Sequence, residues 1–405
     1  MTRLRQLGAV ALLALAPLLS PAAFAQSPAQ NTLKIGFICP FSGGSADFGL
    51  SARQGAELAV EEVNRAGGFL GRPLELVFKD DEAKPDNAQR IAEELISKDK
   101  VVFTIGFCNT GVAMRAIDTF QNAKHVLVVP VSTGTAVTAK FPAKDSYIFR
   151  MSARDAIQAP FLVEEIVERR KLRRVAIFAD KTGYGEGGFK DVSAALKERG
   201  LDPVYVARFD IGVKSLVSEM EAARDAGAQA IVSYTVGPEN GVVTRSRGQA
   251  GVSIPLFGSW PMSFRTVWDT AGSAANGVFM VQTIIEDSGN SRRNSFILGL
   301  NRKLQGKPVP SLMAAAQSYD AVLFMFQVLL QAGFDTSGPN LKRTMENMKK
   351  PYLGVVATHD GPFSADDKDA FSRNMIFLGR WNNGSIDFAY PADARRSAIA
   401  SKKSK

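Results

Sequence analysis

The chain has few of the residues that most often build metal centres and catalytic bases. Its 405 residues include two cysteines, Cys39 and Cys108, and two histidines, His125 and His359. None of the four stands at the spacing of protein metal ligands, so no metal site is expected. No Gly-x-Ser-x-Gly sequence is present, His125 leads into an apolar run, and His359 begins a turn-like His-Asp-Gly-Pro sequence. The sequence therefore predicts neither an enzyme nor a cofactor.

Long hydrophobic runs are also scarce. The first 25 residues combine a basic start, an apolar stretch over 7–19 and a small-x-small ending at 23–25. This pattern is typical of a secretory signal peptide. The stretch contains Pro17 and is too short to span a bilayer, and no cysteine follows position 25 to carry a lipid. We expect residues 1–25 to be removed and the chain to be released into the periplasm. A second apolar run, 321–330, is expected to be a buried helix.

Charge is spread along the chain without a dominant basic cluster. The 49 basic and 40 acidic residues give a formal charge of +9, and loss of Arg3 and Arg5 leaves 47 basic residues and a charge of +7. Part of the excess lies in residues 392–405, which we expect to form a solvated, frayed basic tail. A diffuse excess of this kind is weak evidence for nucleic-acid binding, and export argues against that role.

Apolar runs alternate with segments of helical period from residue 33 to about 281. Such alternation predicts an α/β fold of parallel sheets covered by helices on both faces. Amphipathic helices are expected over 52–63, 85–96 and 113–120. The predicted strands are 33–39, 74–78, 101–105, 126–129, 175–179, 204–209, 230–234, 256–258 and 277–282.

The order of these elements predicts two doubly wound parallel-sheet lobes joined by a three-crossover hinge. One sheet of about five strands would be complete near residue 150, and a second series begins near 174. A helical stretch over 291–347 and short strands near 354–356 and 373–379 follow the second series. We therefore expect lobe 1 to comprise 26–149 and 283–357, and lobe 2 to comprise 150–282 and 358–391. Ligand would lie between the lobes, beyond the carboxyl ends of the strands.

The two cysteines each end an apolar run. If the runs are the first and third strands of a parallel sheet, they are neighbours, and both thiols lie at the same edge. An oxidising compartment would favour a disulfide between Cys39 and Cys108. Two buried free thiols are the alternative, since spacing does not test disulfide geometry.

The loops after the strands carry a resemblance to a known family. The segments include Ile35-Gly-Phe-Ile-Cys-Pro-Phe-Ser-Gly-Gly44 and Asp180-Lys-Thr-Gly-Tyr-Gly-Glu186, together with 55–68, 80–81 and 319–321. In this order they resemble the solute-binding proteins of branched-chain amino-acid-type ABC transporters, which have a type I periplasmic binding fold. The resemblance covers nearly all of the chain after residue 25. It implies a monomer that closes on a small-molecule carboxylate and hands it to an ABC permease in the inner membrane.

The resemblance also implies where the ligand is held. Thr110, at the start of the 113–120 helix, and Ser132 and Thr133 in the next loop would meet the ligand carboxylate. A helix N-terminus offers unpaired N–H donors and a favourable dipole for an anion, although such residues are also common helix caps. Phe48 and Tyr184 would wall the ligand, while a core role remains the alternative for Phe48.

Trp260 is the informative departure from the family pattern. In amino-acid-binding members an acidic residue at this place pairs with the ligand's ammonium group. Here the sequence is Leu256-Phe-Gly-Ser-Trp260-Pro261, with no carboxylate before Asp269. An indole offers an apolar stacking face and one donor, which suits a carboxylate without an α-ammonium, such as an aromatic acid. A shifted alignment would make Glu239 the missing acid. A branched-chain amino-acid or amide binder and a ligand-presenting sensor therefore remain alternatives.

One motif favours a different class of protein. Gly183-Tyr-Gly185-Glu-Gly-Gly188 follows a predicted strand and precedes a helix, as in dinucleotide-binding enzymes. However, residues 180–182 separate the strand from the first glycine, where that motif needs a tight turn at once. The resemblance explains the same glycines as a ligand-facing turn that carries Tyr184, so we disfavour an oxidoreductase.

Overall fold

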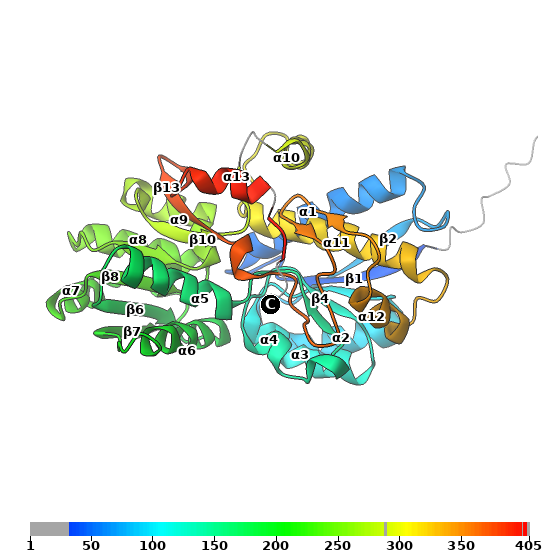
Figure 1. Ribbon diagram of the computed structural model, residues 1–405, viewed down its shortest axis with the longest axis horizontal. Helices are drawn as coiled ribbons and strands as arrows, with labels where there is room; N and C mark the ends of the chain where they lie inside the picture. The colour runs from blue at the N-terminus through cyan, green and yellow to red at the C-terminus, as the bar shows by residue number, and fades with distance from the viewer. Residues whose placement is uncertain (1–31, 287–289, 399, 403–405) are drawn as a thin grey trace, which may run out of the picture. The chain divides into compact units, whose positions relative to one another are not determined.

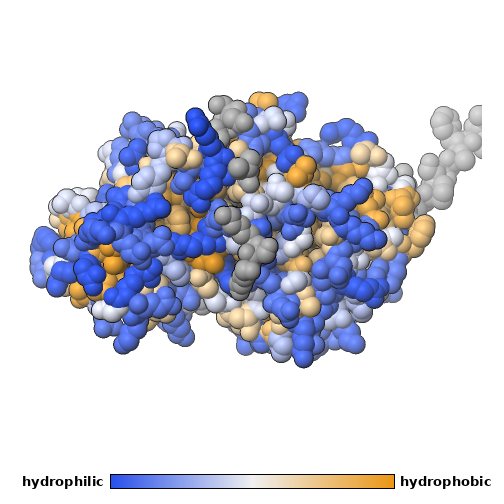
Figure 2. Space-filling view, in the orientation of Figure 1, coloured by the Kyte–Doolittle hydropathy of each residue, from blue (hydrophilic) through white to orange (hydrophobic). Residues whose placement is uncertain are grey.

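The computed structural model describes residues 32–286, 290–398 and 400–402. The predicted signal peptide, residues 1–25, lies outside this part of the chain. Within it, the elements form two parallel-sheet lobes, as the sequence predicts (Figure 1). In Figure 2 the visible face is mainly hydrophilic, with apolar groups in small scattered patches.

The first lobe is built on a five-stranded parallel sheet in the order β2-β1-β3-β4-β5. Both faces of this sheet are covered. On β1, Ile35 and Phe37 share a core with helices α1 and α11, while Ile38 shares a separate core with α2 and α3. Burial on both faces explains why these strands read as continuous apolar runs. The strands are β1 (Leu33–Cys39), β2 (Leu74–Asp80), β3 (Thr104–Gly106), β4 (Leu127–Val129) and β5 (Ile148–Arg150).

The helices of the first lobe come from two distant parts of the sequence. They are α1 (Ala46–Arg65), α2 (Pro85–Glu93), α3 (Thr110–Asn122), α4 (Ala136–Ala139), α10 (Ser291–Lys303), α11 (Leu312–Ala332) and α12 (Gly338–Glu346). Helix α11 is long and apolar enough to cross a membrane, but most of it is buried, which confirms the buried helix predicted over 321–330. It lies so close to α1 that a Cβ on Gly55 would be 1.9 Å from the carbonyl oxygen of Ala315.

The second lobe is built on a seven-stranded sheet in the order β14-β13-β10-β9-β8-β6-β7. Five strands are parallel, and the last two in the sequence add antiparallel pairs at one edge. The strands are β6 (Val175–Asp180), β7 (Tyr205–Phe209), β8 (Ala230–Tyr234), β9 (Leu256–Gly258), β10 (Phe279–Gln282), β13 (Phe377–Asn382) and β14 (Ser385–Phe388). The helices are α5 (Asp155–Glu164), α6 (Gly183–Lys197), α7 (Val217–Asp225), α8 (Gly237–Gln249) and α9 (Arg265–Ala271).

The chain passes between the two sheets three times. The first crossing follows β5, the second follows β10, and the third leads from a small hairpin to β13. The hairpin is β11 (Tyr352–Leu353) and β12 (Thr358–His359). All three crossings must accommodate any rotation of one lobe against the other.

The strand predicted near 373–379 is β13, Phe377–Asn382, and follows a 3₁₀ turn over Arg373–Met375. Two other short strands differ more from the sequence prediction. Strand β3 begins at Thr104, not at residue 101, because the ladder with β1 starts where Gly36 lies opposite Thr104. Residues 354–356 are the turn between β11 and β12, not a strand. In both places apolar side chains mark burial, and burial alone does not specify strand pairing.

The basic tail is more ordered than predicted. Residues Ala392–Ala398 form helix α13, and the buried Ser397 hydroxyl accepts a hydrogen bond of 3.0 Å from Arg293. Beyond it, the Lys402 ammonium donates to the carbonyl oxygens of Pro362 and Asp369. The described part of the tail therefore packs against the third crossing and is not a frayed end.

Candidate ligand-binding site

A small cavity of about 20 Å³ lies where the two lobes meet. Its walls come from segments that follow the carboxyl ends of strands in both sheets, which is where open parallel sheets bind ligands. The first lobe contributes Phe48, Cys108, Asn109, Thr110, Val131 and Thr133, and the second contributes Tyr184, Val236, Trp260 and Pro261.

Five of the six ligand-binding residues predicted from the sequence line this cavity. They are Phe48, Thr110, Thr133, Tyr184 and Trp260. The sixth, Ser132, is not part of the cavity wall, but its hydroxyl oxygen lies 3.1 Å from that of Thr110. Four further lining residues, Asn109, Val131, Val236 and Pro261, carry no signal of their own in the sequence, although all four are adjacent to or near the predicted residues.

The first-lobe wall is a set of hydroxyl groups at a helix N-terminus. Thr110 is the first residue of α3, whose leading N–H groups lack partners within the helix. The Thr110 hydroxyl accepts a hydrogen bond of 3.2 Å from the backbone N–H of Gly134 and pairs with Ser132. If Ser132 donates to Thr110, the Thr110 proton is free to point into the cavity. This wall therefore offers donors to an anion.

A disulfide supports the same wall. Cys39, at the end of β1, is bonded to Cys108, with the two Cα atoms 5.3 Å apart. Cys108 itself lines the cavity, directly before Asn109 and Thr110. The bond closes 69 residues of chain and ties the segment that enters α3 to the neighbouring strand.

The second-lobe wall is aromatic. The Tyr184 hydroxyl is hydrogen-bonded to the Ser259 hydroxyl at 2.7 Å, which fixes the ring against the loop after β9. Trp260 is 1% exposed and begins a short 3₁₀ helix, Trp260–Ser263. Its backbone N–H donates to the Gln158 side chain at 3.2 Å, while its indole N–H has no partner within the described protein.

Phe48 joins the two walls. It is buried on α1, and its ring packs edge-on against that of Phe264 in the second lobe, with centroids 4.2 Å apart. The side chain thus belongs both to the core and to the cavity wall. The two lobes also approach closely at Gly111 and Gly183, where a Cβ on Gly183 would lie 3.2 Å from the Cα of Gly111.

No carboxylate or basic side chain is among the described residues that line this cavity. Asp269 pairs instead with Arg265 at 2.9 Å on the exposed side of α9. Glu239 lines a separate, outer cavity of about 480 Å³ that shares Asn109, Thr110, Tyr184 and Val236 with the inner one. One Glu239 carboxylate oxygen accepts the backbone N–H of Gly212 at 2.9 Å, so this residue also supports its own loop.

A buried acid behind the wall is Asp155, the first residue of α5. It is fully buried, and one carboxylate oxygen accepts a hydrogen bond of 3.1 Å from the Tyr234 hydroxyl. Burial is the main cause that raises the pKa of this carboxyl to about 7; the Thr133 hydroxyl and Arg150 oppose the rise, and nearby Asp191 adds to it. Asp155 therefore carries less than a full negative charge near neutral pH.

The other motifs of interest have structural explanations. In the Gly183–Gly188 segment, a Cβ on Gly185 would lie 2.2 Å from the Asp180 carbonyl oxygen, and one on Gly188 would collide with Tyr234. Close packing thus accounts for these glycines. Both histidines are buried, and burial lowers the pKa of each to about 4. His125 lies 3.1 Å from the Thr104 hydroxyl and is a structural residue of the first lobe.

Comparisons with known proteins agree with this architecture. A family model described as periplasmic binding protein matches residues 32–385. The chain is 26% identical over 374 residues to Leu/Ile/Val-binding protein homolog 3 of Brucella melitensis, covering 91% of this chain and 98% of that protein. This relative and the matched family are binding proteins and not enzymes.

Two solved structures share the fold. A type 1 periplasmic binding protein of Bordetella pertussis superposes with a TM-score of 0.79 at 21% identity, covering 88% of this chain and 99% of that one. A solute-binding protein of R. palustris in complex with benzoate gives a TM-score of 0.77 at 19% identity, covering 88% and 95%. The chain belongs to the periplasmic binding protein family, as a type I member of the branched-chain amino-acid ABC transporter group.

Proposed function

We propose that this protein binds a small carboxylate without an α-ammonium group, most favourably an aromatic acid, between its two lobes. The observation that carries the proposal is the makeup of the cavity wall. Trp260 stands where amino-acid-binding relatives are expected to present an acid, and the described lining residues include no carboxylate. A buried ammonium without such a partner loses several kcal/mol, on the order of a thousandfold in affinity or more.

The two walls suit the two ends of such a ligand. The carboxylate would accept hydrogen bonds from Thr110 and Thr133 and from the N–H groups that begin α3. The ring would lie against the side chains of Tyr184, Trp260 and Phe48, whose faces and edges attract an aromatic partner. Ser132 would act through Thr110 by fixing the direction of its hydroxyl proton. The benzoate complex of the R. palustris protein supports this ligand class.

Binding would be coupled to closure of the lobes. The ligand touches both walls only when the lobes are together, so it favours the closed state by its contacts with the second wall. We further propose that the exported monomer delivers its ligand in the periplasm to an ABC permease.

A ligand panel tests the proposal. The mature chain is unfolded and refolded to remove carried ligand, and melting shifts are recorded with benzoate, hydroxybenzoates, phenylpropanoid acids, leucine, valine and simple amides. A ligand at a hundred times its Kd adds about 2.7 kcal/mol, which raises the Tm by a few degrees. Aromatic acids should shift the Tm and leucine should not.

A branched-chain amino acid is the second candidate. The Brucella relative is named for leucine, isoleucine and valine, and Asp155 is a buried acid close behind Thr133 and Tyr234. If leucine or valine shifts the Tm and the aromatic acids do not, Asp155 is the first residue to substitute, because it would then be the ammonium partner.

A further inference from the structure

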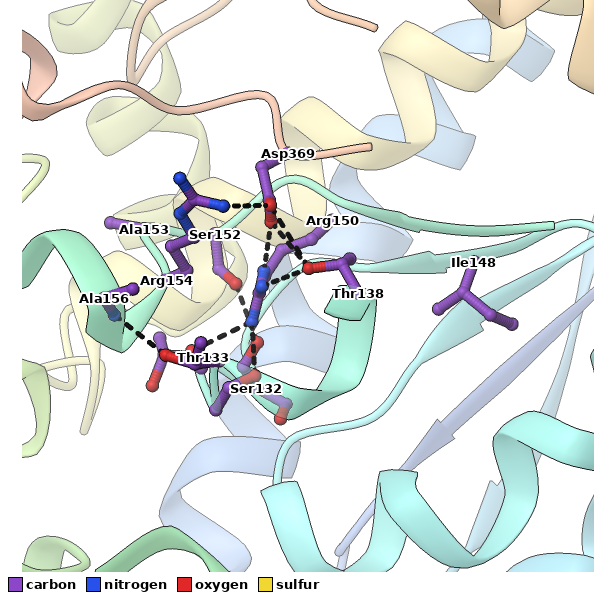
Figure 3. Close-up of polar contacts among 12 residues, drawn as sticks. Ser132, Thr133, Thr138, Ile148, Arg150, Ser152, Ala153, Arg154, Ala156 and Asp369 are labelled. Atoms are coloured by element: carbon purple, nitrogen blue, oxygen red, sulfur yellow. Dashed lines mark hydrogen bonds and ion pairs between the residues drawn. The ribbon is translucent and has the colours of Figure 1, made fainter. Parts of the chain in front are cut away.

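The loop that carries Thr133 is held from behind by the first crossing between the lobes. We call residues 130–135, which follow β4, the binding loop. Three consecutive carbonyl oxygens of this loop accept hydrogen bonds from residues 150–155 (Figure 3). The Ser152 hydroxyl donates to Ser132 at 2.8 Å, the Asp155 N–H donates to Thr133 at 2.8 Å, and the Arg150 guanidinium donates to Thr133 at 2.9 Å and to Gly134 at 2.7 Å.

Arg150 makes the largest share of these contacts. It is the last residue of β5 and is completely buried. One terminal nitrogen of the guanidinium bridges the two loop carbonyls, the other donates to the Thr138 hydroxyl, and Nε donates to Asp369 at 2.6 Å. The guanidinium group is a planar, permanently charged fork of N–H donors, so it can donate to all of these acceptors together. A lysine ammonium cannot reach all of them.

The carboxylate that forms an ion pair with Arg150 belongs to Asp369, in the third crossing. Asp369 is mostly buried, and it also accepts hydrogen bonds from Thr138 at 3.1 Å and from Arg154 at 3.1 Å (Figure 3). The backbones of the two crossings are joined as well. The Arg150 N–H donates to Lys368, and the Ala370 N–H donates to Arg150, each at 2.8 Å.

We propose that Arg150 is a positioning residue for the ligand, which holds the binding loop in the shape that presents Thr133 to the cavity and, with Asp369, fastens that loop to two of the three crossings. Any rotation of the lobes then acts on the same hydrogen bonds that shape the loop. The effect on ligand affinity rests on the proposed function, whereas the effect on the loop itself does not.

Amide hydrogen exchange of the ligand-free protein tests the mechanical part. In Arg150→Met, amides of the binding loop and of residues 150–156 should exchange about tenfold faster or more. The reason is that the loop loses the hydrogen bonds from Arg150 to the carbonyl oxygens of Thr133 and Gly134 and opens more often. Arg247→Met is the matched control. Arg247 is a partly buried arginine that likewise donates to two carbonyl oxygens, of Ile254 and Ala274, but it lies in the second lobe away from the cavity. This control should leave exchange in the binding loop unchanged.

Two milder variants keep the test decisive if Arg150→Met does not fold. Arg150→Lys retains the charge opposite Asp369 but loses the fork, so it should speed exchange in the loop nearly as much as Met does. Asp369→Asn keeps the fork and removes its counter-charge, so a smaller increase is expected. Exchange in the loop no faster than in Arg247→Met, or complete rescue by Arg150→Lys, would overturn the proposal.

Titration with benzoate separates positioning from general stability. Thr133→Val should weaken benzoate binding about tenfold in the natural protein and much less in the Arg150→Lys background, where the hydroxyl is no longer held in place. Equal losses in both backgrounds would contradict a positioning role. If benzoate does not bind even the natural protein, the proposed ligand class fails, while the exchange result still decides whether Arg150 holds the loop.

Discussion

The two walls of the cavity differ in both chemistry and construction. The first-lobe wall presents hydroxyl groups at the start of α3 and is braced by the Cys39–Cys108 disulfide. The second-lobe wall presents the rings of Tyr184 and Trp260 and contains no cysteine. A helix N-terminus recognises the negative charge common to all carboxylates, whereas apolar surfaces recognise what that charge is attached to. The first wall should therefore set affinity and the second wall should set selectivity.

The largest expected effect comes from reversing the chemistry of the second wall. Trp260→Glu places an acid where an α-ammonium would lie, so affinity for leucine should rise and affinity for benzoate should fall. The ratio of the two Kd values should change on the order of a thousandfold, as expected for gain or loss of a buried charge pair. Titration calorimetry with both ligands measures the ratio, with Trp260→Phe as a control that keeps an aromatic wall. An unchanged ratio would remove Trp260 from the selectivity wall.

The disulfide gives a second difference between the lobes. Closing 69 residues of chain is worth about 4 kcal/mol of unfolding free energy in the chain-entropy model. The Cys39→Ser, Cys108→Ser double variant should lose about that much in urea unfolding, and added reductant should have no further effect on it. Proteolysis should then cut first-lobe segments before second-lobe segments. Early cutting in the second lobe would show that the bond does not brace the first wall specifically.

Acid should also destabilise the protein through its two buried histidines. Burial lowers the pKa of His359 to about 4, below the value of about 6.5 in an unfolded chain. The unfolded state therefore binds more protons between these values, so stability is lost as the pH falls from about 6.5 towards 4. Relative to the natural protein, His359→Phe should gain on the order of 3 kcal/mol over that interval.

Unfolding by urea at pH 7, 5.5 and 4 measures this gain as the difference between the two proteins. Burial raises the pKa of Asp320 to about 6 and that of Asp155 to about 7, which gives pH effects of the opposite sign. These groups are present in both proteins and cancel in the difference. If the difference in unfolding free energy between the two proteins does not depend on pH, folding does not change the pKa of His359.

The smallest expected effect is uniform weakening through the first wall. Thr110→Val removes one hydrogen bond to a charged group, worth about 2 kcal/mol, or roughly tenfold to a hundredfold in affinity. The loss should be similar for benzoate and for 4-hydroxybenzoate, and Thr110→Ser should restore most of it. A loss confined to one ligand would mean that the first wall also selects, and no loss at all would remove Thr110 from the site.

The sequence was most informative where neighbouring residues carry the signal. The alternation of apolar runs and helices predicted both sheets, and the strand order places Cys39 beside Cys108, as expected. Residues at strand ends could be placed in one cavity because parallel strands end at a common edge. The direct ligand contact expected for Ser132 stays a prediction, because its side chain is hydrogen-bonded to Thr110 and is not in the cavity wall. The direction of one side chain in a loop depends on such hydrogen bonds, for which the sequence carries no local signal.

Contacts between distant segments left no local signal. Arg150 and Asp369 are separated by 219 positions, and neither belongs to a recognisable pattern. The packing of Lys402 on the third crossing was missed for the same reason, since a run of basic residues at a chain end resembles a solvated tail. Pairing across such separations is decided by the assembled fold.

The described residues that line the cavity include no partner for an α-ammonium group. The most direct measurement is calorimetric titration of the stripped protein with matched pairs: leucine against 4-methylpentanoate, and phenylalanine against 3-phenylpropanoate. Within each pair the two acids share a carbon skeleton, and only the amino acid carries the ammonium. We predict that each plain acid binds more tightly than its amino acid, by about a hundredfold or more. Tighter binding of leucine and phenylalanine than of their plain acids would contradict the account.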